Sequence, residues 1–387
     1  MAIAVSALEK FITLVNETPV TDSTPPHLAP VDTQDSENLI AIDVSLSETK
    51  FDLAKDPADF GIAQLHSAYQ TGVLRPSTLV KSLLSRVEKR EPIIEGWATI
   101  APDLVEQADK CDQQIPSAES NKPLLGIPIG VKDLVDVAGL PTRCGSQQTT
   151  ADPALNDATA ISRLRDAGAI IFGKTTTHEY AFGGTTPPTK NPWDLDRIPG
   201  GSSGGSGAVL GAGMVPGAIG TDTAGSVRIP ASYCGAVGFM GSYGVVPGDH
   251  VAVLAWSLDH VGAMARSVTD TELVFKVLAG IPTSPSSAPI GLPSVIGIPS
   301  AAFEPIHPAV RVAFEKGVDA LIDSGVKIVE VPWPDPELLE AVGFILMMAE
   351  SAAYHRQRMH RPELFDPQVA ELLEQGATVS AGTIFRR

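Results

Sequence analysis

The stretch that decides the fold covers residues 199–244 and reads PGGSSGGSGAVLGAGMVPGAIGTDTAGSVRIPASYCGAVGFMGSYG. A glycine–serine turn at residues 200–206 leads into an apolar run, and a second serine-bearing turn follows at residues 220–226. Glycine adopts positive φ and lets the backbone approach a ligand closely. We therefore interpret both turns as parts of a site. Between them, residues 208–212 predict a tightly packed helix and residues 215–220 predict a strand.

The segments upstream alternate between strands and helices. Residues 124–131 form an apolar run that ends at Lys132 and Asp133, which is typical of a buried strand that brings a lysine to the end of a sheet. Residues 158–166 have helical spacing, and residues 169–172 predict another buried strand. This alternation predicts an α/β fold with a mixed, mostly parallel sheet covered on both faces by helices.

The rest of the chain predicts helices with one further βαβ unit. We divide the whole chain into an N-terminal helix and extended arm at residues 1–55 and one large domain at residues 56–387. Thr269 is the expected N-cap of the helix at 267–278, and Pro76 opens the second helix of the 59–90 segment. The remaining expectations are helices at 3–16, 105–115, 310–324 and 338–358, an arm at 18–43, and strands at 296–299 and 327–331.

Composition excludes several classes of partner. The 387 residues are 43% hydrophobic and carry a formal net charge of −17, which argues against nucleic acid or an anionic membrane as a partner. Three separated cysteines favour a reducing compartment, so we expect a cytoplasmic protein. The N-terminal residues lack the pattern of a signal peptide, and no apolar window is long enough for a transmembrane helix.

Two familiar site patterns fail on inspection. Residues 168–175 satisfy the phosphate-loop pattern GxxxxGK[ST], but Ala-Ile-Ile-Phe inside it forms strands and a phosphate loop must curl. His178-Glu179 is half a metal motif without a second histidine four residues on. We therefore expect no metal and no cofactor. Structural or surface roles are expected for His250 and His260, and no ligand cluster forms around Asp133, Asp136, Asp194 and Asp196.

The serines lack a conventional catalytic base. Residues 200–204 are too rich in glycine and serine to specify the G-x-S-x-G turn of Ser/His/Asp hydrolases, and Ser226 lacks the following glycine. Lys132 can fill the role, because a desolvated lysine favours the neutral amine, which accepts a proton from a hydroxyl. The alternative, which spacing alone favours, is a lysine that caps the strand and pairs with Asp133.

These motifs together resemble the amidase signature family, including its allophanate hydrolase-like and acylamidase-like members. The resemblance covers about residues 56–280 and rests on several ordered motifs, which makes it specific. The motifs are Gly-Gly-Ser-Ser-Gly-Gly-Ser at 200–206, Gly-Thr-Asp-Thr-Ala-Gly-Ser-Val-Arg-Ile-Pro at 220–230, Gly-Ile-Pro-Ile-Gly-Val-Lys-Asp at 126–133, Gly-Lys-Thr at 173–175 with Glu179, and Ser-Leu-Asp-His-Val-Gly at 257–262 with Met-Ala-Arg-Ser at 264–267.

The resemblance implies the amidase signature fold and a Ser–cis-Ser–Lys triad. In it Lys132 is the base, Ser202 is the relay after a cis peptide, and Ser226 is the nucleophile of an acyl-enzyme. The backbone N–H groups of Thr223, Ala224, Gly225 and Ser226 form the implied oxyanion hole. Support for the turns is implied for Ser203, Asp222 and Arg228, the last two as an ion pair.

The implied activity is hydrolysis of a C–N bond in a small-molecule amide, or in a urea-like or carbamate-like substrate. The class is that of hydrolases acting on linear amides other than peptides, without a cofactor. The alternative is an amidotransferase-like subunit or an impaired relative that acts with a partner; a homodimer is compatible with the sequence. Two departures stand out. Ala224 replaces a glycine common in the family, and family members run further than Arg387, so we expect the final strands and helices of their fold to be missing.

Overall fold

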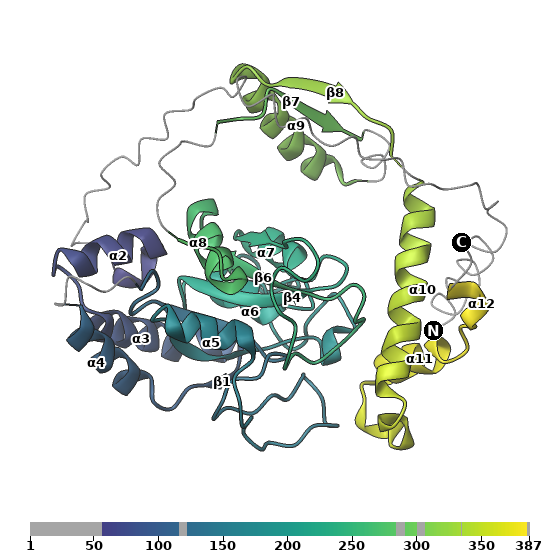
Figure 1. Cartoon of the computed structure of the whole chain (residues 1–387), viewed down its shortest axis with the longest axis horizontal. Coiled ribbons are helices and arrows are strands. Elements are labelled where there is room, and N and C mark those ends of the chain that lie inside the picture. Colours follow the sequence, from purple (N-terminus) through teal and green to yellow (C-terminus); the bar gives the residue numbers. More distant parts are fainter. Residues whose placement is uncertain (1–55, 116–121, 284–290, 300–305, 334, 385–387) are drawn as a thin grey trace. The chain divides into compact units, whose positions relative to one another are not determined.

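The structure is a computed structural model that describes residues 56–115, 122–283, 291–299, 306–333 and 335–384. The helix predicted at 3–16 and the arm predicted at 18–43 lie outside these ranges. The described residues form two compact units (Figure 1). The larger unit takes in the described residues from 56 to 283 together with residues 347–377, and the smaller takes in those of 284–346 and 378–384.

A six-stranded mixed sheet forms the centre of the larger unit, in the order β1-β3-β2-β4-β6-β5. Its strands are β1 (Trp97–Ile100), β2 (Pro128–Lys132), β3 (Ile170–Thr175), β4 (Gly217–Asp222), β5 (Val237–Phe239) and β6 (His260–Ala265). Strand β2 pairs in parallel with β3 and with β4, whereas the outer pairings are antiparallel. The predicted α/β architecture is therefore present, with parallel pairing confined to the three central strands.

Most helices of the larger unit follow the predicted segments closely, whereas α7 lies in a segment for which no helix was predicted. They are α2 (Ile62–Gln70), α3 (Pro76–Ile94), α4 (Leu104–Gln114), α5 (Thr159–Asp166), α6 (Gly204–Gly211), α7 (Arg228–Cys234), α8 (Val268–Ala279), the end of α10 (Pro336–His355) and α11 (Pro367–Gly376). Pro76 opens α3, where a missing N–H costs nothing. The predicted cap of α8 is wrong: Ser267, in extended conformation, accepts from Asp270 N, and Thr269 lies inside the first turn.

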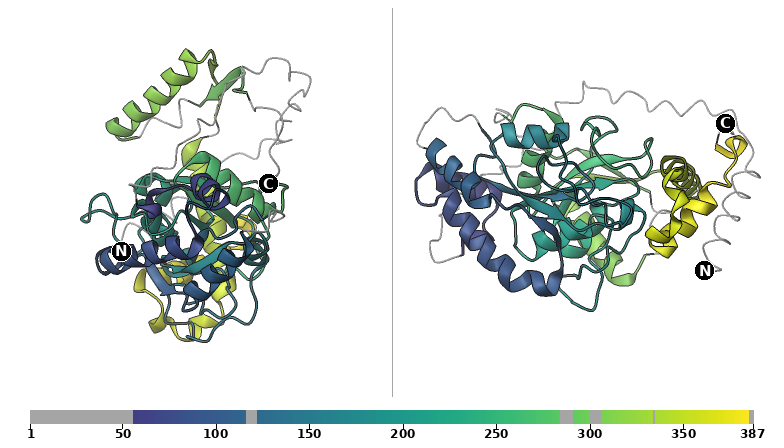
Figure 2. Two further views of the ribbon diagram at one scale, coloured as in Figure 1. Left: turned by 90° about the vertical axis from the view of Figure 1, so that its left-hand side faces the viewer. Right: turned by 90° about the horizontal axis from the view of Figure 1, so that it is seen from below.

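Helices cover both faces of the sheet. Side chains alternate along a strand, so Gly217 and Gly220 of β4 face opposite sides. A Cβ at Gly217 would meet Ile62 of α2 and Val274 of α8, whereas one at Gly220 would meet Ser203 and Val227, which flank α6 and α7. The glycines thus allow close packing of the helices on each face, and Figure 2 shows the sheet between its helices from two further sides.

The smaller unit contains the predicted βαβ unit. Strands β7 (Val295–Ile298) and β8 (Lys327–Glu330) pair in parallel, and α9 (Pro308–Asp323) connects them. The first part of α10 and the short α12 (Ala381–Ile384) complete its described elements.

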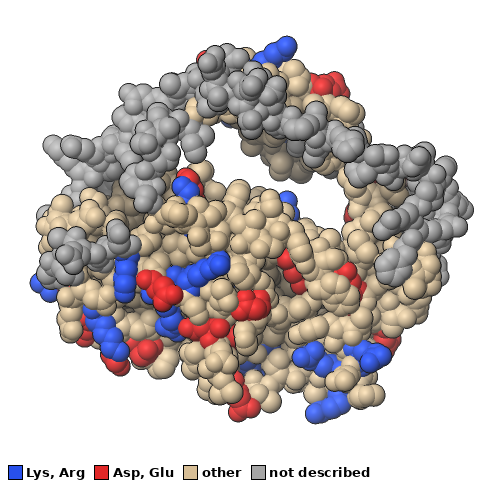
Figure 3. Space-filling view, in the orientation of Figure 1, with Lys and Arg blue, Asp and Glu red and all other residues tan. Residues whose placement is uncertain are grey.

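Short 3₁₀ helices occur within the larger unit at η2 (Pro57–Asp59), η3 (Glu179–Ala181), η5 (Arg358–His360) and η6 (Pro362–Leu364). Within the described ranges, none of the helices has the length and apolarity that a membrane crossing requires. On the face shown in Figure 3, acidic and basic side chains of the larger unit are interspersed.

Candidate active site

Lys132 lies at the end of β2 and is completely buried. The apolar run before it fills the core, which draws the lysine stem into the interior. Its Nζ lies 2.7 Å from Ser202 Oγ and 2.7 Å from Thr221 Oγ1, and 3.5 Å from the Thr221 carbonyl oxygen. The structure therefore brings together the lysine and the first of the two serines that the sequence singled out.

Burial lowers the pKa of Lys132 from its ordinary 10.5 to about 7, against the opposing charges of Asp259 and Asp222. The alternative that Lys132 pairs with Asp133 is wrong. Lys174 of β3 makes that ion pair, at 2.9 Å with both side chains buried. Asp133 extends the pairing of β2 through its N–H to the Thr175 carbonyl, so its side chain points away from that of Lys132. Among the described residues, Lys132 has no carboxylate partner.

Ser202 and Ser203 stand at the start of α6, where every residue from 202 to 210 is buried. The Gly201–Ser202 peptide is cis, as the resemblance implied. The Ser202 carbonyl accepts from His178 N and from Thr186 Oγ1, each at 3.1 Å. Ser203 Oγ donates to the Thr221 carbonyl at 3.1 Å and accepts from Thr221 N at 3.3 Å. These contacts fix the first turn against the end of β4.

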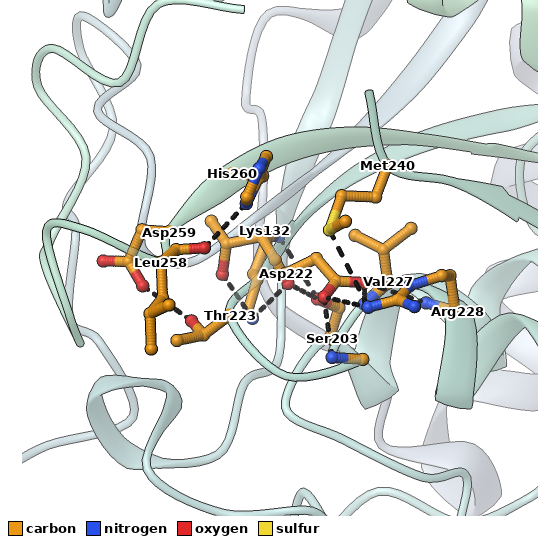
Figure 4. Close-up of polar contacts among 12 residues, drawn as sticks. Lys132, Ser203, Asp222, Thr223, Val227, Arg228, Met240, Leu258, Asp259 and His260 are labelled. Atoms are coloured by element: carbon orange, nitrogen blue, oxygen red, sulfur yellow. Dashed lines mark hydrogen bonds and ion pairs between the residues drawn. The ribbon is translucent and has the colours of Figure 1, made fainter. Parts of the chain in front are cut away.

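The second turn is organised by Asp222, the last residue of β4, which is fully buried. Its carboxylate accepts from the N–H groups of Gly225 at 2.6 Å and Val227 at 3.1 Å, and the Arg228 guanidinium donates to both oxygens at 3.0 Å (Figure 4). Burial alone would raise the pKa of Asp222, but the hydrogen bonds from Arg228 and the backbone outweigh it and lower the pKa. The Asp222–Arg228 ion pair implied by the resemblance is present.

Ser226 follows this turn, and its carbonyl accepts from Ser203 N at 3.2 Å, which ties the two turns together. Of the four N–H groups implied for the oxyanion hole, that of Gly225 is already bound by Asp222. Within the part of the chain that the structure describes, the N–H groups of Thr223, Ala224 and Ser226 donate to no protein acceptor. Of the four implied donors, these three are therefore free of protein acceptors within that part, and that of Gly225 is not.

A cavity of about 270 Å³ lies beside the site. Thr221, whose hydroxyl contacts Lys132, lines it together with Asp259, which accepts from Thr223 Oγ1 at 2.6 Å (Figure 4). Burial raises the pKa of Asp259 in spite of hydrogen bonds from Thr223 and the backbone. Most of the remaining wall is apolar or aromatic, and includes Tyr243, Val246 and Trp256.

Sequence reasoning missed two contributors to this site. Thr221 was given no role, although it directly precedes Asp222 at the end of a predicted strand. Asp259 was quoted within a motif without a function. For Thr221 the available signal was its position, because strand ends of a sheet meet at one edge and Lys132 ends the neighbouring strand.

The patterns that sequence analysis rejected have structural roles. Residues 170–175 form the buried strand β3, so the phosphate-loop pattern runs along a strand as predicted. His250 Nδ1 lies 3.5 Å from Asp136, and His260 Nδ1 bonds the Leu258 carbonyl. Among the described residues, no three His, Cys, Asp or Glu side chains form a cluster that could hold a metal.

Known proteins are similar to this chain in sequence and fold. The family model for amidases matches residues 78–384. An amidase of Pseudomonas putida is 38% identical over 336 residues, which is 83% of this chain and 72% of that protein. A glutamyl-tRNA(Gln) amidotransferase subunit of Symbiobacterium thermophilum is 36% identical over 75% of this chain and 64% of its own length.

Solved structures agree. The crystal structure of an amidase superposes with a TM-score of 0.77 at 33% identity, over 84% of this chain and 75% of that one. The chain thus spans between about two thirds and three quarters of the length of these relatives. The matched family model and these relatives agree with the two serine turns around Lys132. The chain therefore belongs to the amidase family, which is the amidase signature family that its motifs resemble.

Proposed function

We propose that this chain hydrolyses the C–N bond of a small amide through an acyl-enzyme on Ser226. The observation that carries the proposal is the 2.7 Å contact between Lys132 Nζ and Ser202 Oγ, both fully buried. A buried lysine without a carboxylate partner, with a pKa near 7, is about half neutral at neutral pH, and the neutral form can accept a hydroxyl proton. A structural lysine would more often hold an ion pair, as Lys174 does with Asp133.

In the proposed acylation step, Lys132 accepts the proton of Ser202 while Ser202 takes the proton of Ser226. The Ser226 oxygen attacks the amide carbon and forms a tetrahedral intermediate with a negatively charged oxygen. When the C–N bond breaks, the proton returns through Ser202 to the leaving nitrogen. A water molecule then repeats the sequence on the ester, which releases the acid and regenerates Ser226.

The negative oxygen of the intermediate would be bound by the free N–H groups of Thr223, Ala224 and Ser226. One such donor typically contributes about 3 kcal/mol to transition-state stabilisation. Asp222 acts through this turn, since it bonds Gly225 and Val227 on either side of the nucleophile. The apolar cavity beside Thr221 would receive the acyl part of the substrate, and its size suits a small molecule rather than a folded protein. We also propose a cytoplasmic location.

Ammonia release from a library of small primary amides tests the proposal. The wild type is expected to release ammonia from at least one amide, and Ser226→Ala to lose roughly 1,000-fold or more in rate, on the order expected for removal of a nucleophile. Ser242→Ala, an exposed loop serine, is the matched control and should keep wild-type turnover. Unchanged turnover in Ser226→Ala would rule the mechanism out.

A second candidate is a subunit that passes ammonia to a partner, favoured by the 36% identity to an amidotransferase subunit of Symbiobacterium thermophilum. The acyl-enzyme chemistry would be the same, but turnover would depend on the partner. Ammonia release by the isolated chain favours the hydrolase. Turnover that appears only when a co-purifying protein is added back favours the amidotransferase role.

A further inference from the structure

Arg358 has an unusual environment at the start of η5. Its guanidinium carbon lies 5.5 Å from the centre of the Tyr180 ring and 5.1 Å from that of Tyr354. Contacts with aromatic faces occupy the faces of a guanidinium and leave its N–H edge available. Among the described residues, that edge donates to no acceptor and makes no ion pair, although the side chain is half-buried. A guanidinium that is held in one orientation without a counter-ion can bind an anion.

The side chain of Gln148 holds the backbone that carries Arg358 within the larger unit. Gln148 Nε2 donates to the carbonyl oxygens of Arg358, at 3.3 Å, and Arg361, at 2.7 Å. Next to it, His355 is completely buried, and the centre of its ring lies 4.3 Å from that of Tyr180 and 5.5 Å from that of Phe365. The guanidinium is therefore held in place before any ligand binds, which lowers the entropy that binding must overcome.

Arg358 lines a pocket of about 300 Å³ whose other polar walls suit a carboxylate. Thr142 lines it, and its hydroxyl accepts from Lys174 Nζ at 2.9 Å and keeps its own proton available for a ligand. The hydroxyl of Thr149, which also lines the pocket, already donates to the Arg143 carbonyl at 2.8 Å. Among the described lining residues there is one carboxylate, Asp136. Its partner is His250, at 3.5 Å, and no ion pair joins it to Arg358.

This pocket adjoins the cavity beside Thr221. Val251 and Ala252 line both, and the adjacent residues Tyr180 and Ala181 line one each. The first cavity also contains Thr221, which contacts Lys132. A ligand that spanned both cavities would have one end beside Thr221, next to the proposed catalytic residues, and the other at Arg358.

We propose that Arg358 selects substrates that carry a free carboxylate at the end remote from the scissile amide. This substrate class rests on the proposed amide hydrolysis and narrows it to monoamides of dicarboxylic acids and related acidic amides. A planar guanidinium edge pairs with a carboxylate through two parallel N–H···O bonds, and an oriented arginine gives more specificity than a lysine would.

Calorimetric titration of the Ser226→Ala variant with malonamate, succinamate, glutaramate and adipamate tests the carboxylate site without turnover. At least one monoamide is expected to bind about 10- to 100-fold more tightly than the neutral alkanamide of equal chain length, as charge-assisted hydrogen bonds predict. Adding Arg358→Gln should abolish that preference. Arg356→Gln, an exposed arginine two residues away, removes the same charge from the same segment and should retain it.

Turnover by the otherwise native chain gives a second readout. The ratio of kcat/KM for the preferred monoamide to that for its neutral counterpart should fall about 10- to 100-fold in Arg358→Gln, mainly through KM, and recover in part in Arg358→Lys. Equal binding of acidic and neutral amides to Ser226→Ala, or tighter binding of inorganic phosphate than of every monoamide, overturns the carboxylate site. Monoamide binding that depends on Arg358 without any amide turnover would instead refute the hydrolase proposal alone.

Discussion

Replacing Lys132 with methionine should abolish activity and stabilise the fold. Burial holds the pKa of this amine at about 7 instead of 10.5, so in acid the folded protein must carry a buried ammonium without a carboxylate partner. At about 1.4 kcal/mol per pKa unit, protonation disfavours the folded state by about 5 kcal/mol below pH 7. Methionine has a similar length and no charge, so Lys132→Met removes this penalty.

The sign and the pH window follow from proton linkage. Between about pH 7 and 10.5 the unfolded chain binds a proton at Lys132 and the folded chain does not, so wild-type stability rises with pH. From pH 7 to pH 9 this group should add about 2 kcal/mol to the wild type. Lys132→Met lacks the group, so its advantage over the wild type should shrink by the same about 2 kcal/mol.

Urea unfolding of both proteins at pH 7 and pH 9 measures this difference, and the contributions of other titrating groups cancel in the comparison. Lys174→Met is the matched control, because Lys174 is equally buried but pairs with Asp133 at 2.9 Å. Removing one partner of a buried ion pair should destabilise the fold by about 3–5 kcal/mol. A Lys132→Met effect that is the same at both pH values would refute the depressed pKa and with it the neutral base.

Three further predictions concern the same site. The kcat/KM for an amide should rise with pH through a single ionisation near pH 7, because protonated Lys132 cannot accept a proton; a profile flat from about pH 5.5 to 9 would contradict this. In urea unfolding, Asp222→Ala should cost about 3 kcal/mol because it leaves the Gly225 and Val227 N–H groups unsatisfied. Arg228→Ala, with a side chain 51% exposed, should cost under about 1 kcal/mol, and equal losses would argue against this asymmetry. Gly225→Ala should lower the free energy of unfolding by about 1–3 kcal/mol and lose most activity, because the φ of Gly225 is +113° and the new Cβ would lie 2.8 Å from Ile229 Cδ1. A melting temperature equal to that of the wild type would count against this prediction.

The fold was predictable because its signals are local. Apolar runs of strand length predicted β2, β3 and β4, helical spacing and the proline at the start of α3 predicted most helices, and the turns at 200–206 and 220–226 marked the candidate site. Strands β1, β5 and β6 and helix α7 were not predicted. Strand direction was less accessible: β5 and β6 continue the sheet in antiparallel pairing, and the spacing of helices and strands does not determine the direction of outer strands.

Partners of buried charges were the least predictable feature. Lys132 and Asp133 are neighbours in sequence, yet Lys132 contacts Ser202 and Asp133 pairs with Lys174. Which lysine a carboxylate meets depends on the register of β2 with β3, where Val131 lies beside Lys174. Spacing along one segment does not contain that register, so the wrong alternative was the more natural one.

Three other details required the three-dimensional structure. The Gly225 N–H is bound by Asp222, so of the four implied oxyanion donors it is the one already occupied. Ala224, which replaces a glycine common in the family, is exposed and is not among the residues with positive φ, so its methyl group fits the backbone it occupies. Arg358 carries no motif at all, since its role arises from two tyrosines that lie far apart in sequence.

The most direct test of the central claim is to find which serine becomes acylated. The wild type is incubated with a fluorophosphonate and digested, and the labelled residue is identified by mass spectrometry. The account predicts one adduct, on Ser226, that forms faster as pH rises through about 7 and is lost in Lys132→Met. A label on Ser202 or Ser203, or undiminished labelling of Ser226 in Lys132→Met, would contradict it.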